Sequence, residues 1–391
     1  MTGYSEKAYG VGSVETRLHT FAEDEPMRLG NGEVLGPITL AYETHGELNE
    51  KRDNAILLFH ALSGSHHVAG FTESVSGVGK RWTGECQVGW WDDFVGPDKA
   101  IDTRRFYVIC ANYLGGCYGS TGPSSLDPAT GKHYGSSFPH VSVADVVDSQ
   151  MQLLDHLEIE KLHAVIGASL GGMMCLSLAT RYPQRVDVVV PIAASIEVKP
   201  LQRIHNFEQI CAIEHDPHFC GGDYYEGPSP DRGLALARMI SHKTYVSLYT
   251  MQDRARQEVL PTETEGKFSW YPLANPLESY MLYQGHKFIE RFDANSFLRI
   301  VDFWQRFDLV AESGAESMDE LFARCREQNY LIFSIDSDVC FYPEWQEEMA
   351  SVLKQVGVRN MRITVHSEKG HDSFLLEPEL FTPHLAYILG R

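Results

Sequence analysis

A serine flanked by glycines is the strongest chemical signal in this sequence. Residues 167–171 read Gly-Ala-Ser-Leu-Gly; they follow the apolar run LHAVI and precede the helical run GGMMCLSLATRY. In this setting of strand, turn and helix, the GxSxG pattern exposes a serine hydroxyl on a sharp turn at the carboxyl end of a sheet. We therefore interpret Ser169 as a nucleophile, and we expect the N–H of Leu170, at the start of the helix, to help bind an oxyanion.

A nucleophilic serine needs a histidine base, and the histidine needs a carboxylate to orient it. Proteins with this turn carry the three residues in the chain order Ser, Asp or Glu, His. Asp338 follows the apolar run YLIFSI and His371 follows MRITV, so both are expected in loops at the same sheet edge as the serine. Asp336 and His366 compete for these roles, but each directly ends its apolar run, which favours a strand-end or surface position.

Two further loops are expected to line the site. The tight turn His-Ala-Leu-Ser-Gly at residues 60–64 follows the apolar run AILLF, and we assign the second oxyanion donor to the N–H of Leu62. The glycine-rich segment NYLGGCYGSTGPSS lacks both the GxGxxG order and a GK[ST] ending. It is therefore interpreted as a loop lining the site rather than a nucleotide-binding loop.

Histidines elsewhere in the chain do not predict a metal site. His66 and His67 are adjacent, but no carboxylate or cysteine stands beside them at ligand spacing. The same is true of His215, His218 and Cys220. We expect no bound metal and no permanently bound cofactor.

Alternating periods of hydrophobicity indicate the elements that must position these residues. Buried strands are predicted at Ala55 to Phe59, Phe106 to Ala111, Leu162 to Ala168, Val186 to Ala194, Tyr330 to Ile335 and Met361 to Val365. Helices are predicted at Val143 to Leu157, Gly171 to Tyr182, Met318 to Gln328, Pro343 to Gln355 and Glu377 to Leu389. Strands that alternate with helices favour an α/β fold with a mostly parallel sheet covered on both faces.

The alternation stops in a long stretch that is helical in pattern and poor in strand signals. We predict a catalytic domain formed by residues 1–195 and 311–391, interrupted by a helical insertion at residues 196–310. The insertion is interpreted as a cap that closes over the site. Extra core helices packed on the sheet are the alternative.

Composition excludes several classes of protein. Thirty-three basic and 53 acidic residues give a net charge of −20, which excludes a nucleic-acid binder that works through a generally basic surface. No stretch of about 18 apolar residues predicts a membrane span, and the N-terminus does not resemble an export signal. Eight cysteines without CxxC spacing are expected to be reduced thiols. We therefore expect a cytoplasmic protein without nucleic-acid or membrane partners.

Taken together, the motifs strongly resemble those of the homoserine O-acetyltransferase family. The matching segments include AYETHGELN, HALSGSHHVAG, GWWDDFVGP, GASLGG, RGLALARMISH, ESYMLYQGHKFIERFDANSF, SDVCFYP and GHDSFL, and they extend over nearly the whole chain. The resemblance implies an α/β-hydrolase fold with an inserted helical cap and a triad of Ser169, Asp338 and His371. It also implies that Arg238 pairs with the carboxylate of an amino-acid acceptor, and that Asp372 pairs with its ammonium group.

The resemblance further implies a two-step acetyl transfer. Acetyl-CoA, as co-substrate, would acylate Ser169, and L-homoserine would then accept the acetyl group to give O-acetyl-L-homoserine for methionine biosynthesis. A homodimer formed through the cap helices is also implied. A succinyl donor or a serine acceptor on the same scaffold is the alternative, and an esterase or thioesterase is a more distant one.

Overall fold

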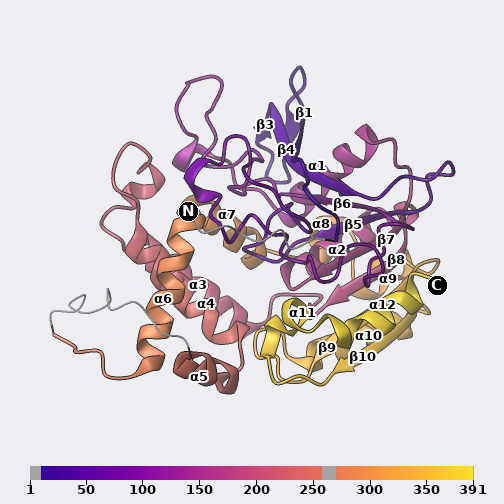
Figure 1. The fold of residues 1–391 in the computed structure, drawn as a ribbon. Helices are drawn as coiled ribbons and strands as arrows, with labels where there is room; N and C mark the ends of the chain where they lie inside the picture. The colour runs from indigo at the N-terminus through magenta and orange to yellow at the C-terminus, as the bar shows by residue number, and fades with distance from the viewer. Residues whose placement is uncertain (1–9, 258–269, 391) are drawn as a thin grey trace.

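The computed structural model describes residues 10–257 and 270–390, and it is built around one twisted sheet (Figure 1). The strand order is β1-β4-β6-β5-β7-β8-β9-β10. The strands from β6 to β10 run parallel to one another, whereas β4 pairs antiparallel with β6 and β1 pairs antiparallel with β4. The strands are β1 Arg17–Phe21, β4 Ile38–His45, β5 Ala55–Phe59, β6 Tyr107–Ala111, β7 Leu162–Ala168, β8 Val186–Ile192, β9 Asn329–Ile335 and β10 Arg359–Val365. A separate small hairpin pairs β2 Met27–Arg28 with β3 Val34–Leu35.

The six predicted strands correspond to β5 through β10, with ends that differ by at most two residues. The antiparallel strands β1 and β4 were not predicted. Strand β4 buries the polar side chains of Glu43 and His45, which breaks its apolar pattern, and β1 is an edge strand whose side chains are mostly exposed. Neither strand therefore carries the continuous apolar run of a strand that is buried on both faces.

Helices cover both faces of the sheet, as predicted. Alternate residues of β5 belong to two different apolar clusters: Leu57 and Phe59 lie in one, and Ile56 and Leu58 in the other. The first cluster includes side chains of α1 Val143–His156, α2 Leu170–Arg181 and α10 Pro343–Gln355, and the second includes those of α12 Pro378–Ile388. Shorter helices are α8 Leu309–Ser313, α9 Met318–Ala323 and α11 Ser373–Leu376, together with the 3₁₀ turns η1 Gly79–Arg81, η2 Gly135–Ser137, η3 Pro183–Arg185, η4 Cys220–Gly222 and η6 Gly370–Asp372.

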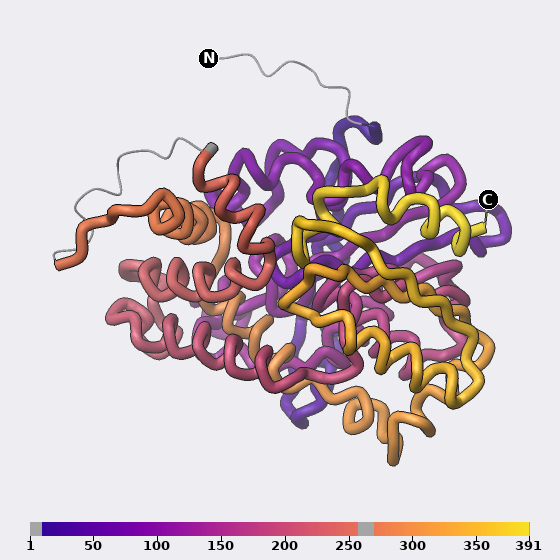
Figure 2. The backbone as a smooth tube through the Cα atoms, turned by 90° about the horizontal axis from the view of Figure 1, so that it is seen from below, coloured from indigo at the N-terminus to yellow at the C-terminus, as the bar shows by residue number. Residues whose placement is uncertain are grey.

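In the described chain, five helices precede the short helices α8 and α9 between β8 and β9. They are α3 Pro200–Glu214, α4 Asp231–Tyr245, α5 Leu248–Gln257, α6 Pro276–Arg291 and α7 Ala294–Gln305. Helix α4 packs against both α3 and α6, and it also contacts the turn η6. Figures 1 and 2 show α3 to α6 grouped together on one side of the sheet. None of the helices in the described part of the chain has the length and apolar character that crossing a membrane requires.

Candidate active site

Ser169 lies on the turn between β7 and α2. Its φ of 59° and ψ of −126° are a strained conformation for a residue with a side chain. The N–H of Ser169 donates to the carbonyl of Ile192 in β8 at 2.9 Å, which ties the turn to the neighbouring strand. The side chain is only 6% exposed. The strand–turn–helix predicted from the sequence is thus present, with the serine at the carboxyl end of the parallel strands.

Two glycines allow this turn to close. A Cβ atom on Gly171 would lie within 3.0 Å of the carbonyl oxygens of Phe59 and His60, because α2 begins directly against the end of β5. A Cβ atom on Gly167 would lie equally close to the carbonyl of Gly171. Side chains at these positions would push the helix away from the sheet, so the spacing of the motif follows from close backbone packing.

Asp338 and His371 come together from the loops after β9 and β10. His371 Nδ1 and Asp338 Oδ2 are 2.6 Å apart, and the side chains are 3% and 0% exposed, respectively. The other carboxylate oxygen, Oδ1, accepts hydrogen bonds from the N–H groups of Cys340 at 2.7 Å and Phe341 at 2.9 Å. The carboxylate is therefore fixed on both oxygens, and it fixes the orientation of the imidazole.

The electrostatic environment of His371 favours its protonated form. Burial alone lowers the pKa of this imidazole, but the charge and hydrogen bond of Asp338, with a further contribution from Asp372, outweigh burial and raise the pKa above its ordinary value. His371 Nε2 is buried and has no hydrogen-bond partner among the described residues. That atom is therefore available to accept a proton from a hydroxyl in the site.

The competing residues form a pair of their own. His366 Nδ1 lies 2.8 Å from Asp336 Oδ2, and the side chain of His366 is 83% exposed. Neither residue lines the cavity that contains Ser169 and His371. The structure therefore places these two residues in a surface ion pair outside that cavity.

The turn after β5 lies beside the serine and presents one of the expected oxyanion donors. The N–H of Gly64 donates to the carbonyl of Ala61 at 2.9 Å, which closes the turn. Since the C=O and N–H of a trans peptide point in opposite directions, the N–H of Leu62 points away from the inside of this turn. In the described chain, the N–H groups of Leu62 and Leu170 donate to no other protein group, so both are free to bind an oxyanion.

Arg238 and Asp372 lie on the wall of the same cavity, which has a volume of about 250 Å³. The guanidinium of Arg238, on α4, lies 5.2 Å from the ring centre of Tyr245 and 5.1 Å from that of Phe288. Neither Arg238 nor Asp372 has an opposite charge within 4.0 Å among the described side chains. Burial raises the pKa of Asp372 and lowers that of Arg238, so both charged forms would gain from a partner of opposite charge.

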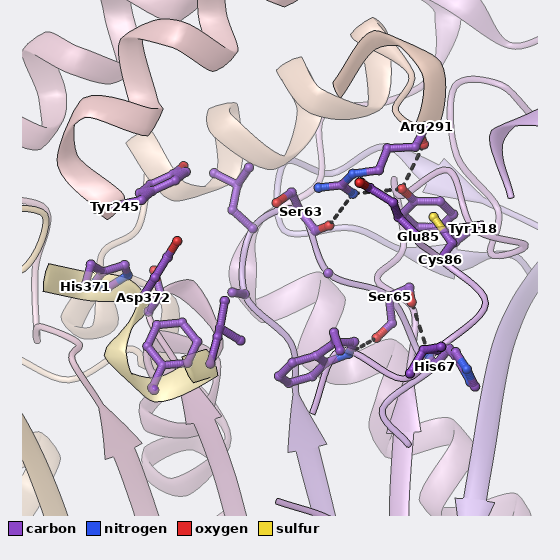
Figure 3. A pocket seen from close by; sticks show the side chains of 18 of the residues that line it. Ser63, Ser65, His67, Glu85, Cys86, Tyr118, Tyr245, Arg291, His371 and Asp372 are labelled. Carbon is purple, nitrogen blue, oxygen red and sulfur yellow. Dashed lines mark hydrogen bonds between the residues drawn. The ribbon is translucent and has the colours of Figure 1, made fainter. Parts of the chain in front are cut away.

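The cavity also contains residues that the sequence did not single out. Figure 3 shows His371, Asp372 and Tyr245 on one side of it, and Arg291, Ser63 and Tyr118 on the other. Tyr118 brings the glycine-rich segment to the wall, as predicted. Arg291 lies within the segment RFDANSF that carries the family resemblance, but neither its spacing nor its neighbours in the sequence indicate a cavity position. Only the packing of α6 reveals it.

The adjacent histidines have other partners. His67 Nδ1 lies 2.8 Å from the buried carboxylate of Glu43, and His66 Nε2 lies 2.9 Å from the hydroxyl of Thr16. In residues 10–257 and 270–390, no group of three or more His, Cys, Asp or Glu side chains is arranged to hold a metal ion. The eight cysteines are free thiols, five of them buried.

Comparison with known proteins agrees with this architecture. The α/β hydrolase fold family model matches residues 54–378. The crystal structure of homoserine O-acetyltransferase from Bacillus anthracis superposes with a TM-score of 0.84 at 26% identity, covering 97% of this chain and 98% of that one. The crystal structure of esterase E22, at 24% identity and a TM-score of 0.84, covers 96% of this chain and 100% of its own, and it shows the same fold.

Relatives of higher identity give a narrower classification. The homoserine O-acetyltransferase of Solidesulfovibrio magneticus is 42% identical over 390 residues, which cover 99% of this chain and 95% of the relative. That of Deferribacter desulfuricans is 41% identical over 385 residues, 98% of each chain. With this similarity over nearly its full length and an α/β-hydrolase fold, the chain belongs to the homoserine O-acetyltransferase family.

Proposed function

We propose that this protein transfers the acetyl group of acetyl-CoA to the side-chain hydroxyl of L-homoserine through an acetyl ester on Ser169. Family membership supports the reaction. The observation that carries the proposal is one cavity that holds a serine, a histidine with a free Nε2, an unpaired cation and an unpaired anion. A hydrolase of simple esters has no need of paired charges in its site, whereas a zwitterionic acceptor does.

In the first half-reaction, Ser169 Oγ attacks the thioester carbonyl while His371 Nε2 takes the hydroxyl proton. The N–H groups of Leu62 and Leu170 stabilise the oxyanion of the tetrahedral intermediate. The C–S bond then breaks, and the thiolate of CoA leaves with the proton returned by His371. An acetyl ester remains on Ser169.

In the second half-reaction, homoserine takes the place that CoA has vacated. His371 accepts the proton of the homoserine hydroxyl as its oxygen attacks the acetyl ester, and it then returns a proton to Ser169 Oγ. The same two N–H groups stabilise the second oxyanion. The products are O-acetyl-L-homoserine, which we expect to enter methionine biosynthesis, and the free enzyme.

Arg238 and Asp372 are proposed to position the acceptor. Arg238 would bind the α-carboxylate and Asp372 the ammonium group, which leaves the hydroxyl end of homoserine directed at the acetyl ester. The two charges lie on different elements, α4 and η6, which contact each other. Since each charge is unpaired in the free protein, the substrate supplies the opposite charge that each lacks.

We further propose that residues 196–310 act as a cap, because α4 and α6 from this insertion supply Arg238 and Arg291 to the cavity wall. A covered cavity would limit hydrolysis of the acetyl ester by water.

The protein is also proposed to form a homodimer through the cap. Ile204 and Phe207 on α3 and Leu236 on α4 are 55%, 62% and 48% exposed, and Phe207 and Leu236 line the same surface hollow. The biosynthetic role and the free thiols support a cytoplasmic location.

Release of free CoA tests the reaction directly. Purified protein is mixed with acetyl-CoA or succinyl-CoA and with L-homoserine or L-serine, and Ser169→Ala serves as the control. We expect rapid CoA release only with acetyl-CoA, homoserine and Ser169 together. A preference for succinyl-CoA or serine would change the specificity and leave the mechanism. Equal release without any acceptor would contradict acyl transfer and indicate a hydrolase.

A further inference from the structure

We propose that Arg291 is a positioning residue for the oxyanion hole, acting through the backbone of the turn at residues 61–64. It would hold this turn in place and polarise the N–H of Leu62. The inference rests on the proposed role of Ser169 as nucleophile, and it adds a residue whose contribution does not depend on which acyl donor or acceptor is used.

A continuous chain of hydrogen bonds leads from the guanidinium to the expected oxyanion donor. Arg291 Nη1 donates to the carbonyl of Ser63 at 3.0 Å (Figure 3). The same peptide group donates through the N–H of Gly64 to the carbonyl of Ala61 at 2.9 Å. The Ala61 carbonyl belongs to the peptide whose N–H is that of Leu62. Two peptide dipoles are thus aligned between a full positive charge and the Leu62 N–H.

This alignment strengthens the last donor in the chain. Hydrogen bonds linked in series polarise one another, and a charged donor at the start of the series adds to the effect. The guanidinium also holds the Ser63 carbonyl, which restrains the peptides of the turn from rotating away from the serine. Gly64 allows the turn to pack this closely, because a Cβ atom there would lie 2.9 Å from Cβ of His60.

The surroundings of Arg291 fix its side chain by hydrogen bonds and ring packing. Nη1 lies 3.1 Å from the hydroxyl of Tyr118, and that hydroxyl donates to the backbone carbonyl of Arg291 at 2.8 Å. The ring of Phe288 lies beneath the guanidinium, with its centre 5.1 Å away. No carboxylate lies within 4.0 Å of Arg291 in the described part of the chain. Glu85 acts on Arg291 from beyond that distance, and the nearest groups on which the positive charge acts are the peptide of Ser63 and the hydroxyl of Tyr118.

The two arginines of the cavity wall differ in a way that separates their roles. Arg238 makes no hydrogen bond to the turn, and its guanidinium lies against aromatic rings, so it can accept a carboxylate from a substrate. Arg291 already uses Nη1 on the turn beside the serine. Loss of Arg291 should therefore affect every step that forms an oxyanion, and loss of Arg238 should affect steps that involve the acceptor.

Acylation by p-nitrophenyl acetate tests this inference, because this ester has neither the phosphates of CoA nor the carboxylate of homoserine. The burst of p-nitrophenolate gives the rate constant for acetylation of Ser169. Removing one direct oxyanion donor typically lowers rates by about 10²–10³-fold, so we expect Arg291→Met to slow acetylation by about 10–100-fold. Acetylation by acetyl-CoA should slow by a similar factor, with the KM for homoserine little changed. Arg291→Lys, which keeps the charge, should restore part of the rate.

Lys243→Met is the matched control. Lys243 lies on α4 and pairs with Glu208 on α3, and neither residue lines the cavity, so this change removes a cation of the insertion without touching the turn. Its acetylation rate should equal that of the unchanged protein. Circular dichroism and thermal unfolding test whether each variant is folded. If Arg291→Met does not fold, the acetylation rate of Arg291→Lys alone tests the inference.

Unchanged acetylation by p-nitrophenyl acetate in the folded Arg291 variants would overturn the inference. A raised KM for acetyl-CoA alone would then assign Arg291 to the phosphates of the donor, and a raised KM for homoserine alone would assign it to the acceptor. The outcome is separable from that of the proposed function. Arg291-dependent acetylation without transfer to homoserine would retain the inference and reject the acetyltransferase.

Discussion

At the scale of single residues, the proposed base is controlled by a carboxylate that is itself held rigidly. Asp338 accepts two backbone hydrogen bonds on one oxygen and faces His371 with the other. The carboxylate therefore cannot turn away, and it keeps the proton on Nδ1 of the neutral imidazole. Nε2 is left as the acceptor, which is the tautomer that a general base requires.

The raised pKa of His371 predicts the acidic limb of the pH–rate profile. Only the neutral imidazole can accept a proton, and the protonated fraction grows as the pH falls through the pKa. Asp338 and Asp372 raise that pKa above about 6.5, the ordinary value for histidine. As the pH is lowered, the rate of Ser169 acetylation should therefore begin to fall before the pH reaches about 6.5. The measurement is the rate of the p-nitrophenyl acetate burst at a series of pH values from about 5 to about 9, which extends to both sides of the ordinary histidine pKa.

Asp338→Asn serves as the comparison for this profile. The substitution removes the charge that raises the pKa, so the acidic limb should move to lower pH. The maximal rate should fall by about 10⁴-fold, as in another triad that loses this carboxylate. An acidic limb at the same pH in both proteins would show that another group controls it.

Replacing Arg238 by methionine should weaken binding of the acceptor. A hydrogen bond to a charged group contributes about 1.5–3 kcal/mol, so we expect the KM for homoserine to rise by about 10–100-fold. The change in acetylation by p-nitrophenyl acetate should be much smaller, since this step precedes acceptor binding. Steady-state kinetics with varied homoserine, together with the burst rate, measure both. A KM within twofold of the original would remove Arg238 from the acceptor site.

At the scale of elements, the site depends on how closely α2 approaches the ends of β5 and β7. The strained φ of Ser169 is maintained because the strand before it and the helix after it are both buried. The loops after β9 and β10 bring Asp338 and His371 to the same edge, because parallel neighbouring strands end on the same side of a sheet. The turn after β5 and the end of α6 then complete the cavity from the opposite side.

Gly171→Ala tests this close approach. The added methyl group would lie within 3.0 Å of two backbone carbonyls of β5 and its following residue, and backbone cannot move as a side chain can. We expect a loss of about 1–3 kcal/mol in the free energy of unfolding, the usual cost of overpacking, and a lower rate of Ser169 acetylation. Urea unfolding and the burst assay measure the two effects.

Gly84→Ala is a suitable control because a Cβ atom at that position would meet no atom within 4 Å and its φ is not in the left-handed region. Its free energy of unfolding should change by less than about 0.5 kcal/mol, as is usual for surface substitutions. If Gly171→Ala were as stable and as active as this control, backbone contact at the turn would not set how closely α2 approaches the end of β5.

At the scale of the whole molecule, a strongly acidic protein places two arginines in one cavity. The net charge of −20 repels anionic substrates at long range, whereas Arg238 and Arg291 provide positive charge where an anion would bind. Both arginines come from the segment between β8 and β9, on helices that contact the rest of the site only in the folded chain.

The proposed dimer gives a prediction at this scale. If the exposed apolar side chains of α3 and α4 form the interface, the protein should have twice the mass of one chain in size-exclusion chromatography with light scattering. Phe207→Asp would bury a charge at such an interface and should shift the mass to that of a single chain. Tyr387→Asp is the control, because Tyr387 is 68% exposed on α12. A single-chain mass for the unchanged protein would contradict the proposal.

The sequence by itself determined the features that depend on local pattern. Strands buried on both faces are recognised in the sequence as continuous apolar runs. The serine turn is recognised as a motif because close backbone packing requires glycine at residues 167 and 171. A mostly parallel α/β sheet with a nucleophilic serine turn could therefore be predicted, and the resemblance of longer segments implied the family and its α/β-hydrolase fold. Strand β4 could not be predicted, because its Glu43 carboxylate is buried in contact with His66 and His67, which lie more than twenty residues away in the sequence.

Only the tertiary structure decided which charges meet and which remain unpaired. Asp336 and Asp338 are two residues apart in the sequence, yet one pairs with an exposed histidine and the other with a buried one. Arg291 shares a cavity wall with Ser63 although 228 positions separate them. The physical reason is that burial and hydrogen-bond partners are set by elements packed from distant parts of the chain, and local spacing carries no record of them.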